Sequence, residues 1–120
     1  FMRTSSLIQE SLQSIAVDIT RILEISITED DWKRYTKGDK GIFVRKLVGF
    51  RDKNKLPLIK QKFEKDSEFR EYIDRFIAQY DNLLSKAAQG DHSGALAATF
   101  QTSDVGKLHT LLSKALGREI

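Results

Sequence analysis

Hydrophobic residues recur at intervals of three and four in the first part of the chain. The stripe that they form consists of Ile8, Leu12, Ile15, Ile19 and Ile22, and most positions between them are polar. Side chains spaced in this way lie on one face of an α-helix, so the pattern predicts a helix from about Ser5 to Ser26. β-branched residues are dense between Val17 and Ile27, which leaves a strand there as the alternative.

Capping signals divide the next part of the chain into three short helices. Thr28 is a candidate N-cap followed by acidic residues at 29–31, and Gly38 offers an end for that helix. Asp39 is a candidate cap for the next helix, which ends between residues 49 and 52. Its apolar face holds Phe43, Val44, Leu47 and Val48. Residues 52–55 are predicted to form a loop, and Pro57 suits the first position of a helix that carries Ile59 and Phe63.

The longest periodic segment follows and is predicted to be the central core helix. It begins after Asp66, and its apolar positions are Phe69, Tyr72, Ile73, Phe76, Ile77, Tyr80, Leu83, Leu84 and Ala87. Residues 90–94 form a glycine-rich turn before a short helix that carries Leu96, Ala97 and Phe100. Thr102 and Ser103 are alternative N-caps for a last helix that ends at Gly117. Gly106 inside that helix indicates close packing against a neighbouring element.

These elements predict one all-α domain, a compact bundle of about six or seven helices over residues 1–120. A chain of 120 residues has the usual size of a single domain and can bury one core. The stripe from Ile8 to Ile22 is more apolar than an N-terminal arm can leave in water, so it predicts self-association through that helix. The alternative is that the helix folds back into its own bundle.

The inventory of reactive side chains argues against an enzyme. The chain has no cysteine, which excludes disulfides, thiolate metal sites and cysteine nucleophiles. The two histidines, His92 and His109, fall in different elements, so a triad or a multi-histidine zinc site is not expected. The glycines of residues 38–41 mark the end of one helix and the start of the next, although the backbone amides beside Lys40 could hold a phosphate. We therefore expect no catalytic, cofactor or metal site.

No run of residues approaches the length of about 20 apolar positions that spans a bilayer, and no secretory signal is recognisable. We therefore expect no membrane span and a cytoplasmic location.

Positive charge is concentrated in one segment. Of the 20 lysines and arginines, 11 lie between residues 33 and 62, where two aspartates oppose them, so this stretch carries a formal charge of +9. The candidate partner-binding residues are Lys33, Arg34, Lys37, Lys40, Arg45, Lys46, Arg51, Lys53 and Lys55. Such a segment can attract an anionic partner, and its aromatic residues, Trp32 among them, could stack on bases. The alternative is a solvated basic face over core aromatics.

A second nucleic-acid candidate is the helix pair of residues 96–116, which could form a helix-turn-helix. Asp104 at the start of its second helix would repel phosphate, which weighs against this interpretation.

Residues 31–118 resemble a segment of uncharacterised helix-rich bacterial proteins. The similar stretches are Trp32-Lys33-Arg34-Tyr35, Gly38-Asp39, Ile42-Phe43, Glu68-Phe69-Arg70, Leu83-Leu84 and Ser103-Asp104-Val105-Gly106-Lys107-Leu108. The resemblance implies a bacterial, cytoplasmic helical module and assigns no functional residues. The sequence thus favours a non-enzymatic protein-interaction or scaffold domain that binds a protein partner or itself, with a nucleic-acid-binding domain as the alternative.

Overall fold

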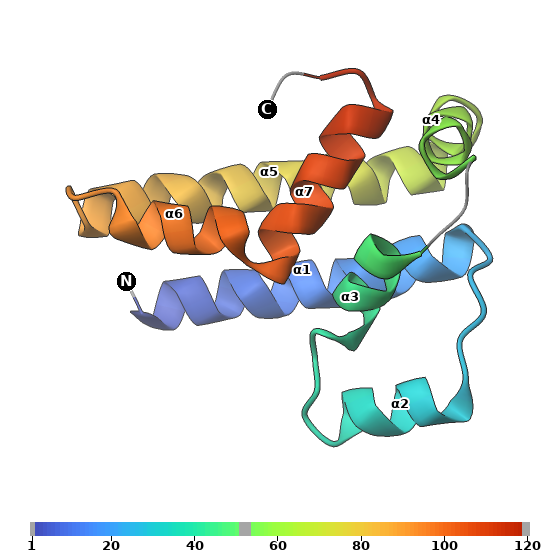
Figure 1. Ribbon diagram of the computed structural model, residues 1–120, viewed down its shortest axis with the longest axis horizontal. Coiled ribbons are helices and arrows are strands. Elements are labelled where there is room, and N and C mark those ends of the chain that lie inside the picture. Colours follow the sequence, from blue (N-terminus) through green and yellow to red (C-terminus); the bar gives the residue numbers. More distant parts are fainter. Residues whose placement is uncertain (1, 51–53, 119–120) are drawn as a thin grey trace.

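Two long antiparallel helices form the base of the fold (Figure 1). The computed structural model of the chain describes residues 2–50 and 54–118. In it, α1 (Met2–Ile22) lies alongside α5 (Ser67–Gly90). The other helices are α2 (Glu29–Thr36), α3 (Ile42–Gly49), α4 (Lys55–Lys65), α6 (Ala95–Thr102) and α7 (Asp104–Ala115). The described residues contain no strand, so the all-α prediction is confirmed and the strand alternative near residues 17–27 is wrong.

The core lies where α7 crosses the two long helices. α7 contacts five other helices, and its side chains Leu108 and Leu112 are buried. Phe69 and Phe76 of α5 are completely buried, as is Phe43 of α3. Large aromatic side chains supply much of the apolar area that drives folding. The prediction that the helix around residues 69–87 is central to the core is therefore confirmed.

The predicted helix caps Thr28 and Ser103 are present, and Asp66 forms a further cap at the start of α5. The Thr28 hydroxyl accepts a hydrogen bond from the Asp31 amide at 3.1 Å, and the Asp31 carboxylate accepts one from the Thr28 amide at 2.9 Å. Asp66 accepts from the Phe69 amide at 3.1 Å, and Ser103 accepts from the Gly106 amide at 3.3 Å. Each cap satisfies an amide that the first helical turn leaves without a partner.

Three other predicted helix boundaries were wrong. α1 ends at Ile22, four residues before the predicted end, and Glu24 then takes a left-handed conformation with φ of 58°. Asp39 does not cap α3, whose N-cap is Gly41 without a side-chain hydrogen bond. The Asp39 carboxylate instead accepts hydrogen bonds from the Arg45 guanidinium, a charged donor that competes with backbone amides. Pro57 is the third residue of α4 rather than the first, still within the first turn, where its missing amide costs nothing.

Gly106 allows α6 and α7 to join through a single residue. A Cβ atom at this position would collide with the backbone of Phe100 and Gln101 at the end of α6. The close approach predicted from the sequence is confirmed, because only glycine leaves room for it.

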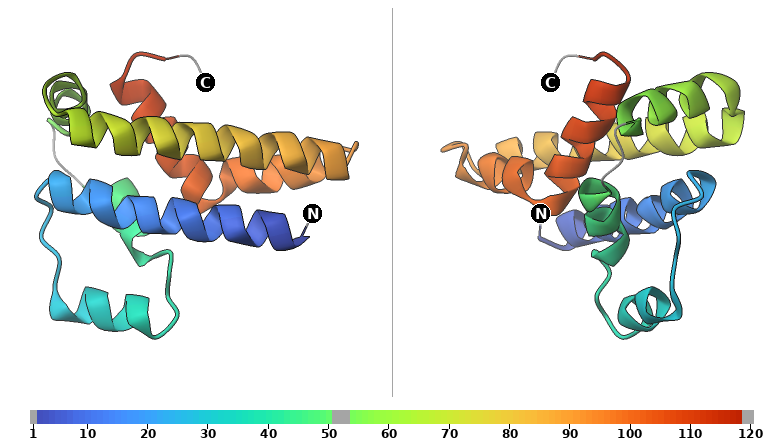
Figure 2. Two further views of the ribbon diagram at one scale, coloured as in Figure 1. Left: turned by 180° about the vertical axis from the view of Figure 1, so that it is seen from behind. Right: turned by 45° about the vertical axis from the view of Figure 1, so that its right-hand side comes forward.

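α2 stands away from the rest of the molecule (Figure 2). Within the described residues it contacts α3 and no other helix, and none of its own residues is buried. Loops on either side of α2 lead back to α1 and α3.

Candidate functional site

Among the described residues, the basic segment is divided among several elements of the fold. Its residues are distributed over α2, the following loop, α3 and α4, and α2 and α4 do not touch each other. Arg51 and Lys53 lie outside the described residues. Because the positive charges sit on separate elements, the segment gives a weaker local field than its formal charge suggests.

Four members of the segment are already engaged by other groups of the chain. Arg34 pairs with Asp30 at 3.0 Å, Arg45 with Asp39 at 2.6 Å and Lys46 with Asp31 at 2.7 Å. The Lys55 ammonium donates to the carbonyl of Val48 at 2.9 Å, and its partial burial lowers its pKa.

Acidic residues within α2 and its loop cancel much of the remaining charge. Residues 29–41 contain four acidic and four basic side chains, so their formal charge is zero. Within the described residues, Lys33 and Lys37 have no ion pair, while the Lys40 ammonium lies 4.3 Å from the centre of the Tyr35 ring. This balance favours a partner of mixed charge over a polyanion.

An aromatic cluster joins α2 to the bundle. The Trp32 ring centre lies 5.1 Å from that of Phe43 and 6.3 Å from that of Tyr35, and the Tyr35 and Phe43 centres are 5.4 Å apart. Phe43 is fully buried, whereas Trp32 is 43% exposed. Trp32 therefore covers a core residue with one side and presents the rest of its ring to solvent.

The short helix that carries Trp32 is held at both ends. At its start, the capping box of Thr28 and Asp31 is reinforced by the ion pair of Asp31 with Lys46. At its end, Gly38 adopts a φ of 117°, and the Asp39 amide donates to the Arg34 carbonyl at 2.9 Å. An isolated helix of eight residues is unstable in water, so these interactions keep α2 helical.

A shallow hollow lies beside the start of α2. It has a volume of about 510 Å³ and is lined by Ile25, Ser26, Lys46, Gly49 and Phe50. Lys46 belongs both to this hollow and to the ion pair that anchors α2. Lys46 therefore links the hollow to the ion pair of Asp31, the residue before Trp32, which makes α2 and its surroundings the candidate interaction surface.

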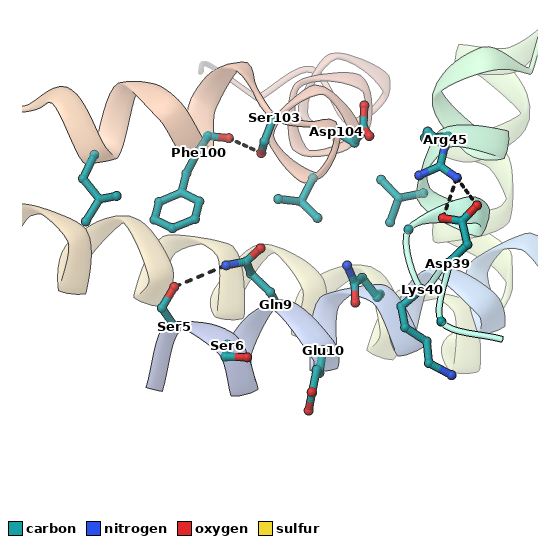
Figure 3. A pocket seen from close by; sticks show the side chains of 16 residues that line it. Ser5, Ser6, Gln9, Glu10, Asp39, Lys40, Arg45, Phe100, Ser103 and Asp104 are labelled. Atoms are coloured by element: carbon teal, nitrogen blue, oxygen red, sulfur yellow. Dashed lines mark hydrogen bonds and ion pairs between the residues drawn. The ribbon is translucent and has the colours of Figure 1, made fainter. Parts of the chain in front are cut away.

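A larger polar cleft of about 700 Å³ opens elsewhere, between α1, residues 38–41 and the α6–α7 junction (Figure 3). Several of its polar groups are bonded to neighbouring groups of the chain. Gln9 donates to the Ser5 hydroxyl at 3.3 Å, and the Ser103 hydroxyl donates to the Phe100 carbonyl at 2.5 Å. Arg45 is held by Asp39 at the same cleft, and Lys40 extends away from Arg45. Arg45 is thus neutralised, whereas Lys40 within the loop has no ion pair among the described residues, so the phosphate-binding interpretation of residues 38–41 stays a prediction.

The histidines do not converge on a reactive site in the described structure. His109 Nε2 lies 3.8 Å from the Asp81 carboxylate, beyond hydrogen-bonding distance, and its ring stacks on Tyr80 with centres 4.3 Å apart. Burial lowers the pKa of His109, against the opposing charge of Asp81. His92 is exposed in the turn after α5. No group of three or more histidine and acidic side chains in the described residues could hold a metal ion.

The helix-turn-helix interpretation finds little support in the geometry. A single residue, Ser103, separates α6 from α7, whereas DNA-binding pairs of helices have a turn of three or four residues. α7 would have to enter a DNA groove, yet it packs against α1, α3, α4, α5 and α6. Its exposed polar residues include Asp104, as the sequence already indicated.

The residues predicted for self-association are used inside the chain. Ile8, Leu12, Ile15 and Ile19 are buried, and Ile22 packs partly buried against the same core. The fold-back alternative describes α1 correctly, because α5 and α3 cover its apolar face. Oligomerisation itself stays a prediction and would require a different surface.

Among the described residues, no helix is long and apolar enough to cross a membrane. Comparison with protein-family models, with curated proteins and with solved structures finds no match for this chain. The resemblance to helix-rich bacterial proteins therefore stays a prediction, and functional inference rests on the chain itself.

Proposed function

We propose that this chain is a non-enzymatic protein-interaction domain whose contact surface is centred on Trp32 of α2. The observation that supports the proposal is a helix with no buried residue that is nevertheless fixed at both ends and displays a half-exposed tryptophan. Tryptophan is enriched among the residues that dominate the energy of protein interfaces. Following the sequence resemblance, we place this activity in the bacterial cytoplasm.

Pre-organisation is the reason that α2 suits this role. A partner that binds a rigid helix does not have to supply the free energy for ordering it. No residue of α2 is buried, so the helix adds little to the core. Its caps and the Asp31–Lys46 pair instead hold its exposed surface in one defined position.

Affinity capture with the full chain as bait tests the proposal. Wild-type chain is expected to retain specific proteins, which can include further copies of itself, and Trp32→Ala is expected to lose them. Leu7→Ala is the matched control because Leu7 is another exposed apolar residue, 59% exposed on α1. Equal capture by wild type and Trp32→Ala would overturn the proposal for this surface.

The alternative function, binding of single-stranded nucleic acid, is favoured by a specific observation. Lys33 and Lys37 lie on the same short helix as Trp32, and Lys40 lies over Tyr35. Lysines beside exposed aromatic rings can contact phosphates while the rings stack on bases.

A fluorescence titration decides between the two functions, since Trp32 is the single tryptophan of the chain. Random DNA and RNA, single-stranded and duplex, are added at two salt concentrations. The interaction proposal predicts no quenching of Trp32 at either salt. Micromolar binding that quenches Trp32, weakens steeply with salt and disappears in a Lys33→Glu, Lys37→Glu, Lys40→Glu variant would establish the alternative.

A further inference from the structure

The charges of α2 are divided along its length. Its first turn is acidic, with Glu29, Asp30 and Asp31, and Lys33 and Arg34 follow in its second half. Lys37 is the C-cap. Trp32 is the fourth of the eight helical residues and therefore lies near the middle.

We propose that the partner at this surface is a second copy of the chain, bound through antiparallel pairing of two α2 helices about a twofold axis. This proposal rests on the interaction function proposed above. A twofold interface uses the same patch on both copies, so the patch must complement itself. In the antiparallel arrangement the acidic start of each helix lies alongside the basic end of the other.

The side chains without intrachain partners match this arrangement. Within the described residues Glu29 has no ion pair, and neither do Lys33 and Lys37, which lie four and eight residues further along. Antiparallel pairing brings Glu29 of each copy towards Lys33 and Lys37 of the other. The twofold axis repeats the contact, so one kind of pairing satisfies both ends of the interface.

Charge balance distinguishes a second copy from a strongly charged foreign partner. The formal charge of residues 29–41 is zero, so this surface has no net field to select an acidic or a basic protein. Its segregated charges instead match a surface with the opposite order, which an antiparallel copy supplies. Lys33→Glu with Lys37→Glu would remove this match without touching Trp32.

The position of α2 and of Trp32 fits such a contact. α2 projects from the bundle, so two copies can meet through it (Figure 2). Pairing near the middle of each helix covers Trp32 of both copies, and residues near the centre of an interface usually dominate its energy. One short helix from each copy buries little surface, so the dimer is expected to be weak and concentration-dependent.

Sedimentation of the full chain over a wide concentration series, with Trp32 emission recorded in parallel, tests the dimer. The mass is expected to rise towards twice that of the monomer while the emission shifts to the blue, because Trp32 leaves water. Trp32→Ala should weaken association at least tenfold, with its folding verified by circular dichroism. Lys60→Glu on α4, which does not contact α2, is the control that should leave association unchanged.

Charge exchange tests whether Glu29 and the two lysines face each other across the interface. Glu29→Lys alone and the double variant Lys33→Glu, Lys37→Glu should each lose self-association, since like charges then face each other. An equal mixture of the two variants restores both contacts and should form a heterodimer with at least tenfold higher affinity than either variant has for itself. Failure of the mixture to associate would overturn the antiparallel pairing.

The outcomes separate this inference from the proposed function. A monomer at every concentration, or a dimer indifferent to Trp32→Ala, overturns pairing through α2. If the monomeric chain still captures another protein in a Trp32-dependent way, the proposed function stands without the self-pairing. If neither association nor capture depends on Trp32, both are wrong.

Discussion

The ammonium group of Lys46 lies 2.7 Å from the carboxylate of Asp31, and this ion pair joins α3 to the first turn of α2. The same carboxylate accepts the Thr28 amide, so one side chain both caps α2 and anchors it to the bundle. Every function proposed for Trp32 depends on this anchor, because Trp32 follows Asp31 directly.

Removal of the Asp31 carboxylate should therefore loosen α2. Asp31→Ala is expected to cost about 1 kcal/mol, the usual value of a lost helix cap. Trp32 should become more exposed, which shifts its emission to the red, while the core helices keep their circular dichroism.

The stabilisation that Asp31 gives to α2 should also depend on pH. The hydrogen bond from Lys46 lowers the pKa of Asp31, so this stabilisation is present above the unfolded pKa of about 3.9 and is lost as the pH falls through the lower folded pKa. An emission change below about pH 4 that persists in Asp31→Asn would contradict this assignment.

Stability should also fall on mild acidification because of His109. Burial against Tyr80 lowers the pKa of His109, so the folded state favours the neutral ring. The resulting stabilisation is complete above the unfolded pKa of about 6.5 and is lost as the pH decreases through the lower folded pKa. Melting temperatures between pH 7.5 and 5.5 should decline less in His109→Gln than in wild type, and NMR titration of the ring should give the lowered pKa. An identical decline in both proteins would show that His109 is not responsible.

Phe76 should be among the most costly core residues to truncate. Its side chain is fully buried in α5, so Phe76→Ala is expected to destabilise the domain by about 3–5 kcal/mol in chemical denaturation. Leu56→Ala serves as the comparison, since Leu56 is 37% exposed and should cost less than about 0.5 kcal/mol. Equal midpoints for the two variants would mean that the core is wrongly placed.

Alanine should have opposite effects at two helical glycines. Gly106→Ala forces a Cβ into the backbone of Phe100 and Gln101, which should cost about 3 kcal/mol despite the better helix propensity of alanine. At Gly49 the same atom meets nothing within 4 Å, so Gly49→Ala should be neutral or stabilise by up to about 1 kcal/mol. Thermal melts of both variants measure the difference, and a stable Gly106→Ala would disprove the close helix junction.

A charge in the stripe of α1 should unfold the domain rather than split a dimer. Ile15 is 5% exposed, and burial of an unpaired carboxylate there should cost more than about 4 kcal/mol in Ile15→Asp. Leu7→Asp, on an exposed face of the same helix, should remain folded. Circular dichroism measures whether each variant is folded, and light scattering measures its mass. If the stripe were an interface, Ile15→Asp would instead be a folded monomer.

Local signals in the sequence determined which segments are helical and where most of them begin. The three-and-four spacing of apolar residues in α1 and α5 fits the period of a helix, and Thr28, Asp66 and Ser103 cap helices with their own neighbours. The prediction that Asp39 caps a helix was wrong because its carboxylate binds Arg45 instead of backbone amides, and the packing of α3 fixes the position of Arg45. Gly106 indicated a close approach, and the structure identified the end of α6 as the neighbour.

The tertiary structure decided which apolar and charged surfaces remain available. The stripe of α1 was predicted to bind a second copy, and Trp32 was predicted to stack on bases or to join the core. In the structure α5 and α3 cover the stripe, whereas Trp32 is 43% exposed. Likewise, three cations of the basic segment form ion pairs with Asp30, Asp31 and Asp39, so the segment does not present all of its charge to a partner. Hydrophobic periodicity requires that a face be covered, but it does not specify by what. Coverage depends on contacts between residues distant in the chain, which the fold alone brings together.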